Sequence, residues 1–486
     1  MKQERISIKK NYIYSLIYQL SIIIIPLITT PYISRVLNAD GIGIYSYTVS
    51  IVTYFSMFAT LGVAVYGQLE IASYRDNVGT RSKTFWEILV ARTITSVIVC
   101  GIYIVFIILN NKYRTMYIIL LLNIIATMLD ISWYFQGVEK FKLTVTRNLI
   151  VKIMGTILIF LFVKKQTDLY KYALILQGTI LIGNLTLWPY LKKEVEKVSF
   201  KELKFYKHWK KSIIFFIPTF ATSVYTVLDK SMIGWITGSE FQNGYYEQAH
   251  KIEQTLVTMI TSLGIVTMPR VKYLLNNKSE DQAHNIIDNA MEFIIFISIP
   301  MMFGLFIVTN NLVPWFLGEN YLECIPILKI FSVLMLVVGL DSTIGRQCLM
   351  AAGKQSQFNI GVICGAITNF ILNMILIPKF NAVGAAVASV SAEIVILTIF
   401  MYYSRNFLNI NKMIKSIIKY SIYSCVMSLI AIVATKLIGG TYLQRMITTV
   451  TTAVIVYAII LIATKDNMIN KSIDLIKNKI KKKEAV

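Results

Sequence analysis

The sequence predicts an all-α integral membrane protein with about fourteen transmembrane helices, arranged as two six-helix lobes and two further C-terminal helices. Apolar residues make up 56% of the 486 residues and charged residues only 15%, and the mean hydropathy is +0.62. Apolar runs long enough to cross about 30 Å of hydrocarbon recur from the N-terminal region almost to the C-terminus. Short matching segments in the two halves indicate that one helical unit is present twice.

Each predicted span is an apolar run of about 20 residues bounded by polar residues. The predicted spans are residues 11–34, 42–66, 86–109, 115–137, 146–163, 170–191, 212–236, 252–275, 288–309, 325–346, 357–377, 383–403, 415–437 and 444–463. Because their number is even, both termini lie on the same side of the membrane. The segments on that side hold most of the Lys and Arg residues, so the positive-inside rule places both termini in the cytoplasm.

The formal net charge of +22 does not indicate nucleic-acid binding, because the cations are divided among short segments between apolar runs. A metal centre is not indicated either, since the five cysteines are scattered without a CxxC pair and the three histidines lack an HExxH arrangement. No glycine-rich loop has the spacing that cradles a phosphate or a dinucleotide. We therefore expect no metal and no bound cofactor.

The longest predicted inner connection divides the chain into two lobes. We predict an N-terminal lobe over residues 1–198, a C-terminal lobe over 199–408, two further helices over 409–464 and a basic amphipathic cytoplasmic tail over 465–486. The connection Lys192–Lys211, called the linker below, carries eight lysines among aromatic residues, a composition typical of a membrane interface. We interpret it as a solvated linker that anchors the topology, in preference to a regulatory site.

Sequence matches support the duplication. Gly43–Tyr45 precedes a Leu-Gly pair at residues 61–62, and Gly244–Tyr246 precedes another at residues 263–264. Each half contains an even number of helices, so both copies run in the same direction. They would be related by an axis along the membrane normal.

Ionisable residues inside the predicted spans are the candidate functional residues. An ionised side chain in hydrocarbon costs at least about 2.5–3.5 kcal/mol, so it persists only where it faces protein or a wet cavity. Cations in a cavity would hold an anion such as a pyrophosphate, and acids would take up H⁺ or Na⁺ as a coupling ion. The candidate substrate-binding cations are Arg35, Lys152, Lys230 and Arg346, and the candidate ion-coupling acids are Asp130, Asp229, Asp341 and Glu393.

Each of these residues has a structural alternative. Arg35 and Arg346 lie near predicted helix ends, where a side chain that reaches the headgroups explains them at least as well. Lys152 and Lys230 lie deeper in their spans. Lys230 could also simply neutralise the adjacent Asp229.

Several motifs together resemble one known family, and the resemblance extends over nearly the whole chain. The motifs are Pro31–Leu37, Gly41–Tyr47, Asp130–Gly137, Leu228–Gly234 and Gly244–Tyr246. In combination they resemble the Wzx-type polysaccharide flippases of the multidrug/oligosaccharidyl-lipid/polysaccharide exporter superfamily. The Arg35 and Asp229-Lys230 positions match family patterns, whereas Lys152, Asp341 and Glu393 rest on the burial argument alone.

The resemblance implies a function as well as a fold. It implies that an undecaprenyl-pyrophosphate-linked oligosaccharide repeat unit moves from the inner to the outer leaflet of a bacterial cytoplasmic membrane, for capsule, O-antigen or exopolysaccharide synthesis. We expect alternating access, with a cavity between the lobes, and contacts with membrane lipids and the polysaccharide polymerase machinery. No covalent chemistry is needed, so we expect a transporter and not an enzyme.

Three alternatives stay open at this point. A multidrug extrusion antiporter shares the superfamily fold but would favour an acidic cavity, and acidic residues are present here. A membrane polysaccharide polymerase or sugar transferase is disfavoured by short outer loops. A passive channel suits a duplicated chain with charges inside the membrane less well than a rocking transporter does.

Overall fold

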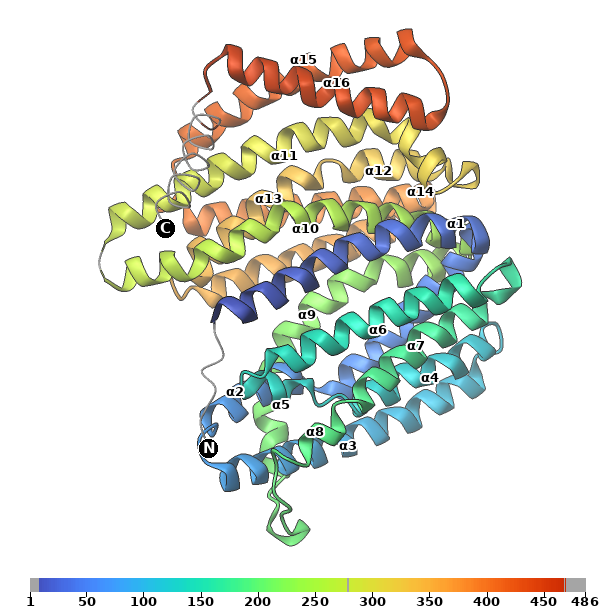
Figure 1. Cartoon of the computed structure of the whole chain (residues 1–486), viewed down its shortest axis with the longest axis vertical. Coiled ribbons are helices and arrows are strands. Elements are labelled where there is room, and N and C mark those ends of the chain that lie inside the picture. The colour runs from blue at the N-terminus through green and yellow to red at the C-terminus, as the bar shows by residue number, and fades with distance from the viewer. Residues whose placement is uncertain (1–7, 278, 467, 469–486) are drawn as a thin grey trace. The chain divides into compact units, whose positions relative to one another are not determined.

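The computed structural model describes residues 8–277, 279–466 and 468, and these residues form helices joined by short connections (Figure 1). The predicted tail after residue 468 and the first seven residues lie outside the described part. The chain divides into two compact units, Met1–Gly244 and Tyr245–Val486, which are described separately below. The predicted boundary between residues 198 and 199 separates the two sequence repeats, which is a different division from that of the compact units, and it stays a prediction.

The first unit contains most of the shorter helices. Its elements are α1 (Ile8–Thr60), α2 (Val63–Ser73), α3 (Val78–Leu109), α4 (Arg114–Met128), α5 (Ser132–Gly137), α6 (Phe141–Phe162), η1 (Gln166–Asp168), α7 (Leu169–Leu185), α8 (Trp188–Leu191), η2 (Phe200–Glu202) and α9 (Tyr206–Thr237). The helix α10 (Glu240–Asn276) begins in this unit and continues into the next.

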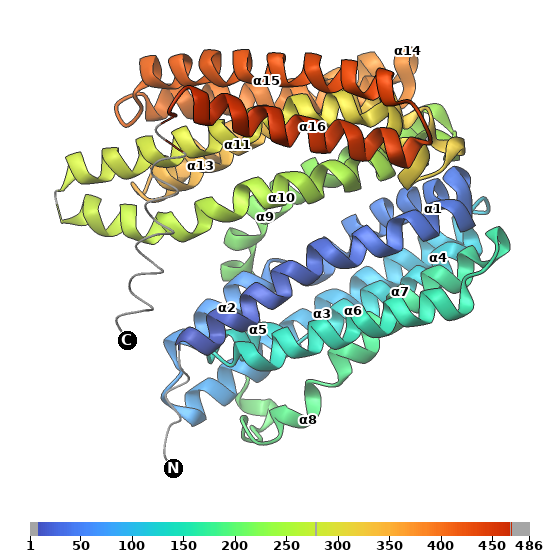
Figure 2. The same ribbon diagram turned by 45° about the horizontal axis from the view of Figure 1, so that its top comes forward.

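The second unit is built on long helices. After α10 its elements are α11 (Glu280–Phe316), η3 (Glu319–Tyr321), α12 (Cys324–Phe331), α13 (Leu334–Thr343), the π-helix η4 (Ile344–Met350), α14 (Gln355–Ser404), α15 (Ile410–Ile438) and α16 (Tyr442–Ala463). Figure 2 shows α15 and α16 running side by side, and α11 packs against both. Buried Met427, Ala431 and Ala453 form the contact between α15 and α16.

The helices agree with the predicted spans. Within the described residues, ten helical segments are long and apolar enough to cross a membrane. Two of them, Ile23–Ser73 and Gln355–Ser404, each extend over two predicted spans, the first from residue 23 onward, and the spans are joined at an asparagine with positive φ, Asn38 or Asn381. The more polar helices α9 and α10 coincide with the two remaining predicted spans. The prediction of an all-α membrane protein with about fourteen spans is confirmed.

The two asparagines have a local physical role. Asn38 has φ 55° and Asn381 has φ 50°, a region that most side chains avoid but asparagine tolerates. Each therefore lets the backbone leave one helix and start the next without a long loop. This is why α1 and α14 each contain two helices.

Apolar side chains cover the outer surface as well as the core. On α3, Ile98 and Ile102 are 58% and 57% exposed, while Tyr103 on the same helix is fully buried. A soluble protein would not expose so much apolar surface. A bilayer is therefore the solvent of this chain, which is a multi-pass membrane protein.

One sequence motif proves to be core. Trp133, Tyr134 and Phe135 on α5 are buried against α2 and α3, and the Phe85 and Trp133 rings stack with centroids 5.4 Å apart. A methyl group on Gly67 of α2 would lie 2.5 Å from the Trp133 ring, so glycine is needed for this approach. The motif residues therefore hold α2, α3 and α5 together.

Candidate functional site

Three predicted cations lie on neighbouring helices of the first unit. Arg35 is on α1, Lys152 on α6 and Lys230 on α9, and α1 packs against both other helices. At 1.5 Å per residue, Lys230 lies roughly 10 Å and Lys152 roughly 15 Å before the end of its helix. Arg35 is exposed and stands three residues before the break at Asn38, whereas Lys152 and Lys230 are half-buried.

Polar contacts join α1 to α9 around the Asp229-Lys230 pair. The Tyr54 hydroxyl lies 2.7 Å from Ser231 Oγ, and the Asp229 carboxylate is close enough to act electrostatically on the same hydroxyl. Asp229 is 6% exposed. The Asn243 side-chain amide donates to the Lys230 carbonyl at 2.6 Å. Sequence reasoning found the charged pair but missed these contacts, because Tyr54 is far away in the sequence and Asn243 binds a backbone carbonyl across a turn between two helices.

Asp130 occupies a different setting. Its side chain accepts a hydrogen bond from the Ser132 backbone N–H at 2.9 Å and lies 3.9 Å from Arg147. The buried guanidinium of Arg92 donates to the backbone carbonyls of Asp130 and Thr127. These contacts give Asp130 a structural role at the start of α5. Its assignment to ion coupling stays a prediction.

The second unit brings three predicted residues together. Asp341 on α13 is 6% exposed and its carboxyl group is hydrogen-bonded to that of Glu393 on α14. Arg346, on the π-helix that follows α13, is close enough for its charge to act on Asp341. Two carboxyl groups can share a hydrogen bond only when one of them carries a proton. The assignment of Asp341 and Glu393 to ion coupling stays a prediction.

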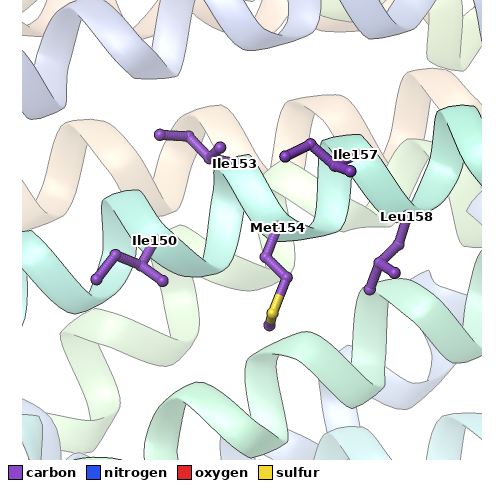
Figure 3. Close-up of a pocket in the computed structure, with 5 residues that line it drawn as sticks. All are labelled: Ile150, Ile153, Met154, Ile157 and Leu158. Carbon is purple, nitrogen blue, oxygen red and sulfur yellow. The ribbon is translucent and has the colours of Figure 1, made fainter.

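An apolar hollow lies on the face of α6 opposite to Lys152. It has a volume of about 260 Å³ and is lined by Ile150, Ile153, Met154, Ile157 and Leu158, all on α6 (Figure 3). The side chains form two rows at four-residue spacing, and the three isoleucines are more than half exposed. A positive charge and an apolar surface therefore occur on the same stretch of one helix.

A close backbone contact joins α1 to the start of α10. A methyl group added to Gly43 would lie 1.7 Å from the Glu240 carbonyl oxygen, and one added to Gly244 would lie 1.9 Å from the Ala39 carbonyl oxygen. Only glycine allows backbones to approach this closely. These two glycines head the duplicated motifs of the sequence. We call the contact among Ala39, Gly43, Glu240 and Gly244 the glycine seam.

Charged and phenolic groups tie the seam to the connection between α3 and α4. Glu240 Oε1 accepts from the Tyr113 hydroxyl at 2.6 Å and lies 3.0 Å from Lys112 Nζ. Burial, with the hydrogen bond to Glu240, raises the pKa of Tyr113 to about 12. Burial alone would raise the pKa of Glu240, but the hydrogen bonds from Tyr113 and Lys112 outweigh it and the pKa is lowered. The carboxylate form of Glu240 therefore stabilises this end of the unit.

A second buried polar network was missed by sequence reasoning. The Glu87 carboxylate lies 2.9 Å from His208 Nε2 and 2.7 Å from Lys207 Nζ, and the Tyr66 hydroxyl lies 2.6 Å from His208 Nδ1. Glu87 and His208 are each 1% exposed. The only sequence signal was a histidine inside a lysine-rich segment, which does not identify its partners.

Comparison with known proteins places the chain in a family. The family model described as polysaccharide biosynthesis protein matches residues 8–275, more than half of the chain. The chain belongs to the polysaccharide biosynthesis protein family. The resemblance to Wzx-type flippases inferred from the motifs is thereby confirmed.

Relatives of this family member carry transporter names. A protein of Escherichia coli (strain K12), provisionally named an O-antigen transporter, is 22% identical over 412 residues, which cover 84% of this chain and 99% of that one. A Haloferax volcanii protein, provisionally named a low-salt glycan biosynthesis flippase, is 24% identical over 45% of this chain and 46% of its own length.

Solved structures show the fold that this polysaccharide biosynthesis protein adopts. The lipid II flippase MurJ in an inward closed conformation is similar with a TM-score of 0.71 and 16% identity, over 93% of this chain and 99% of that chain. An inward-facing multidrug resistance transporter of the MATE family has a TM-score of 0.60 and 12% identity, over 80% and 98%. The superfamily fold predicted from the sequence is confirmed.

Proposed function

We propose that this polysaccharide biosynthesis protein is a flippase that moves an undecaprenyl-pyrophosphate-linked oligosaccharide repeat unit from the inner to the outer leaflet. Its family membership and its transporter-named relatives support a glycan transporter and not an enzyme. The observation that carries the substrate class is the placement of Arg35, Lys152 and Lys230 on neighbouring helices of one unit. Three cations at graded depths suit a phosphate-bearing head that must cross the membrane.

Two opposite faces of α6, one with Lys152 and one with the apolar hollow, suit the two chemistries of such a substrate. The ammonium group would attract the pyrophosphate, and the apolar hollow on α6 would contact the polyprenyl chain. Because the polyprenyl chain remains in the hydrocarbon of the bilayer, only the sugar and the pyrophosphate need a polar path across the membrane.

Alternating access is the proposed mechanism, and the glycine seam supports it. The seam holds α1 against the start of α10 at the end of the unit that the topology places outside. Outward release would require these segments to separate. A close contact between two backbones can part and re-form as a unit.

The carboxyl pair Asp341 and Glu393 is the proposed coupling site. It holds a proton when the two groups are hydrogen-bonded, and loss of that proton would place two negative charges side by side. Repulsion would then favour a different arrangement of α13 and α14, which links proton movement to a conformational change. The pair makes H⁺ the better candidate ion, and Na⁺ is the alternative outcome of the test.

The remaining parts of the proposal concern the cell. We place the chain in a bacterial cytoplasmic membrane with both termini in the cytoplasm, as the positive-inside rule indicates. The product would be passed to polysaccharide polymerase machinery for capsule, O-antigen or exopolysaccharide synthesis.

The test is transport in proteoliposomes that contain a fluorescent undecaprenyl-pyrophosphate oligosaccharide. Lys152→Ala and Lys230→Ala should each lower the flipping rate at least tenfold, and Lys379→Ala should not, because Lys379 is an exposed lysine of α14 outside the site. Equal rates in all three variants would remove the lysines from the substrate path. Efflux of dye cations in place of the lipid-linked sugar would favour the multidrug antiporter, and product formation from the substrate would favour a polymerase.

Coupling is tested in the same vesicles with an imposed pH gradient. Asp341→Asn and Glu393→Gln should each abolish the acceleration by the gradient and retain slow downhill flipping, because the amides cannot exchange a proton. Acceleration by a Na⁺ gradient alone would replace H⁺ by Na⁺. Full pH-driven transport in both variants would exclude the pair.

A further inference from the structure

The first residues of the linker Lys192–Lys211 are attached to α3 of the same unit. The Glu196 backbone N–H donates to Ser82 Oγ at 2.9 Å, and Trp86 Nε1 donates to the Glu196 carbonyl at 3.0 Å. Arg81 donates to the Glu194 carbonyl at 3.0 Å. The backbone is therefore held against α3 by three side chains of that helix.

A second attachment holds the end of the linker. The Lys204 backbone N–H donates to Glu87 Oε1 at 2.9 Å, and Trp209 Nε1 donates to the Ala91 carbonyl at 3.1 Å. His208 is buried against the same Glu87. The structure therefore holds the linker at both ends, and its interpretation as a solvated linker that anchors the topology stays a prediction.

The lysines and two of the aromatic side chains of the linker are exposed. All eight lysines are exposed, and the Phe200 and Tyr206 rings are 65% and 63% exposed. Lys207 and Lys211 pair with Glu87 and Glu70. Within the described part of the chain six linker lysines form no ion pair: Lys192, Lys193, Lys197, Lys201, Lys204 and Lys210.

The position of the linker agrees with a membrane interface. Figures 1 and 2 show the segment that follows α8 projecting sideways from the helices of its unit, and not continuing along their axes. In a membrane-spanning unit a sideways projection at a helix end runs along the headgroup layer. Exposed lysines and aromatic rings are the side chains suited to that layer.

We propose that the linker is a preformed platform that binds the headgroups of anionic phospholipids in the inner leaflet. The unpaired lysines complement the phosphate charge, and Phe200 and Tyr206 enter the interface beside them. Because the backbone is already ordered by α3, binding does not have to order the chain. An acidic protein partner is the competing occupant.

The experiment titrates the purified full-length chain in detergent with phosphatidylglycerol and with phosphatidylcholine, and counts bound lipids by native mass spectrometry. Each lysine near an anionic surface contributes about a fivefold gain in affinity. Lys201→Ser/Lys210→Ser should therefore lower the affinity for phosphatidylglycerol about 25-fold and leave phosphatidylcholine unchanged. The charge-matched control is Lys272→Ser/Lys415→Ser, two exposed lysines outside the linker.

A second variant tests whether the platform is preformed. Trp86→Phe keeps every linker charge and removes the donor to Glu196, so it should lower phosphatidylglycerol affinity by up to about fivefold. The matched control is Trp188→Phe, which loses an equivalent hydrogen bond to the Leu129 carbonyl outside the linker.

The outcomes are distinct. Equal losses in the two lysine variants, or no preference of the wild type for phosphatidylglycerol, would overturn the proposal. Stronger binding of polyglutamate than of phosphatidylglycerol would assign the surface to an acidic protein and also overturn it. Neither result depends on which substrate the protein transports.

Discussion

Replacing Gly43 by alanine is the sharpest perturbation of the glycine seam. The added methyl carbon would lie 1.7 Å from the Glu240 carbonyl oxygen, 2.6 Å from its carbonyl carbon and 2.9 Å from the Gly244 nitrogen. All three atoms belong to the backbone at the start of α10, so no flexible side chain can move aside. The two segments must separate by about 1.5 Å to restore ordinary contact distances.

The magnitude follows from the cost of such overpacking. An extra methyl group in a well-packed contact costs about 1–3 kcal/mol. If the closed seam is one state of an alternating-access equilibrium, the same energy changes the ratio of closed to open molecules about 5- to 150-fold. Gly244→Ala should shift the ratio in the same direction. The double variant should add little, because an open seam no longer resists the second methyl group.

The assay is a distance measurement between spin labels at Thr167 and Phe241, in a chain whose native cysteines are replaced. Thr167 is exposed on η1, which packs against α1, and Phe241 is exposed at the start of α10. Gly43→Ala should move the distance distribution toward a longer separation. The control is Gly178→Ala in α7, where an added methyl group meets nothing within 4 Å.

Two results would refute the reasoning. A distance distribution identical to that of the wild type, with unchanged thermal stability, would show that the close contact does not exist. A lower melting temperature with the short distance retained would show that the seam is only structural and does not open.

Three further predictions concern the polar contacts of the first unit. Tyr113→Phe should lower the free energy of unfolding by about 1 kcal/mol in a thermal denaturation series, because Glu240 loses a donor. Because the pKa of Glu240 is lowered, its contribution to the free energy of unfolding is present above the ordinary glutamate pKa of about 4.3 and is lost as the pH falls through its pKa in the folded state. The free energy of unfolding should therefore decline more steeply between about pH 5 and pH 3 in the wild type than in Glu240→Gln. Parallel plots of stability against pH for the two proteins would contradict this. Glu87→Ala should cost about 3 kcal/mol because it leaves buried His208 without its carboxylate. Glu87→Gln should cost less because the amide oxygen still accepts from the linker backbone, and equal melting temperatures of the two variants would contradict this reason.

The sequence by itself determined the helices, because membrane spanning depends on local composition. A run of about 20 apolar residues must form its backbone hydrogen bonds internally in lipid, whatever its neighbours are. The predicted ends of the spans on either side of Asn38 and Asn381 therefore agree with the backbone breaks in the structure. The family motifs were also recognisable from the residues alone. The depth of Lys152 within its span also followed from counting residues.

Only the tertiary structure decided which distant residues meet. Both Asp341 and Glu393 are predicted ion-coupling acids, but the hydrogen bond between them depends on the packing of α13 against α14. The contact between Gly43 and Glu240, and the attachment of the linker to α3, join segments far apart in the sequence. Apolar patterning specifies which residues enter the bilayer, but in lipid it hardly distinguishes one helix neighbour from another. Close backbone approach and polar pairing make that choice, and both depend on three-dimensional geometry.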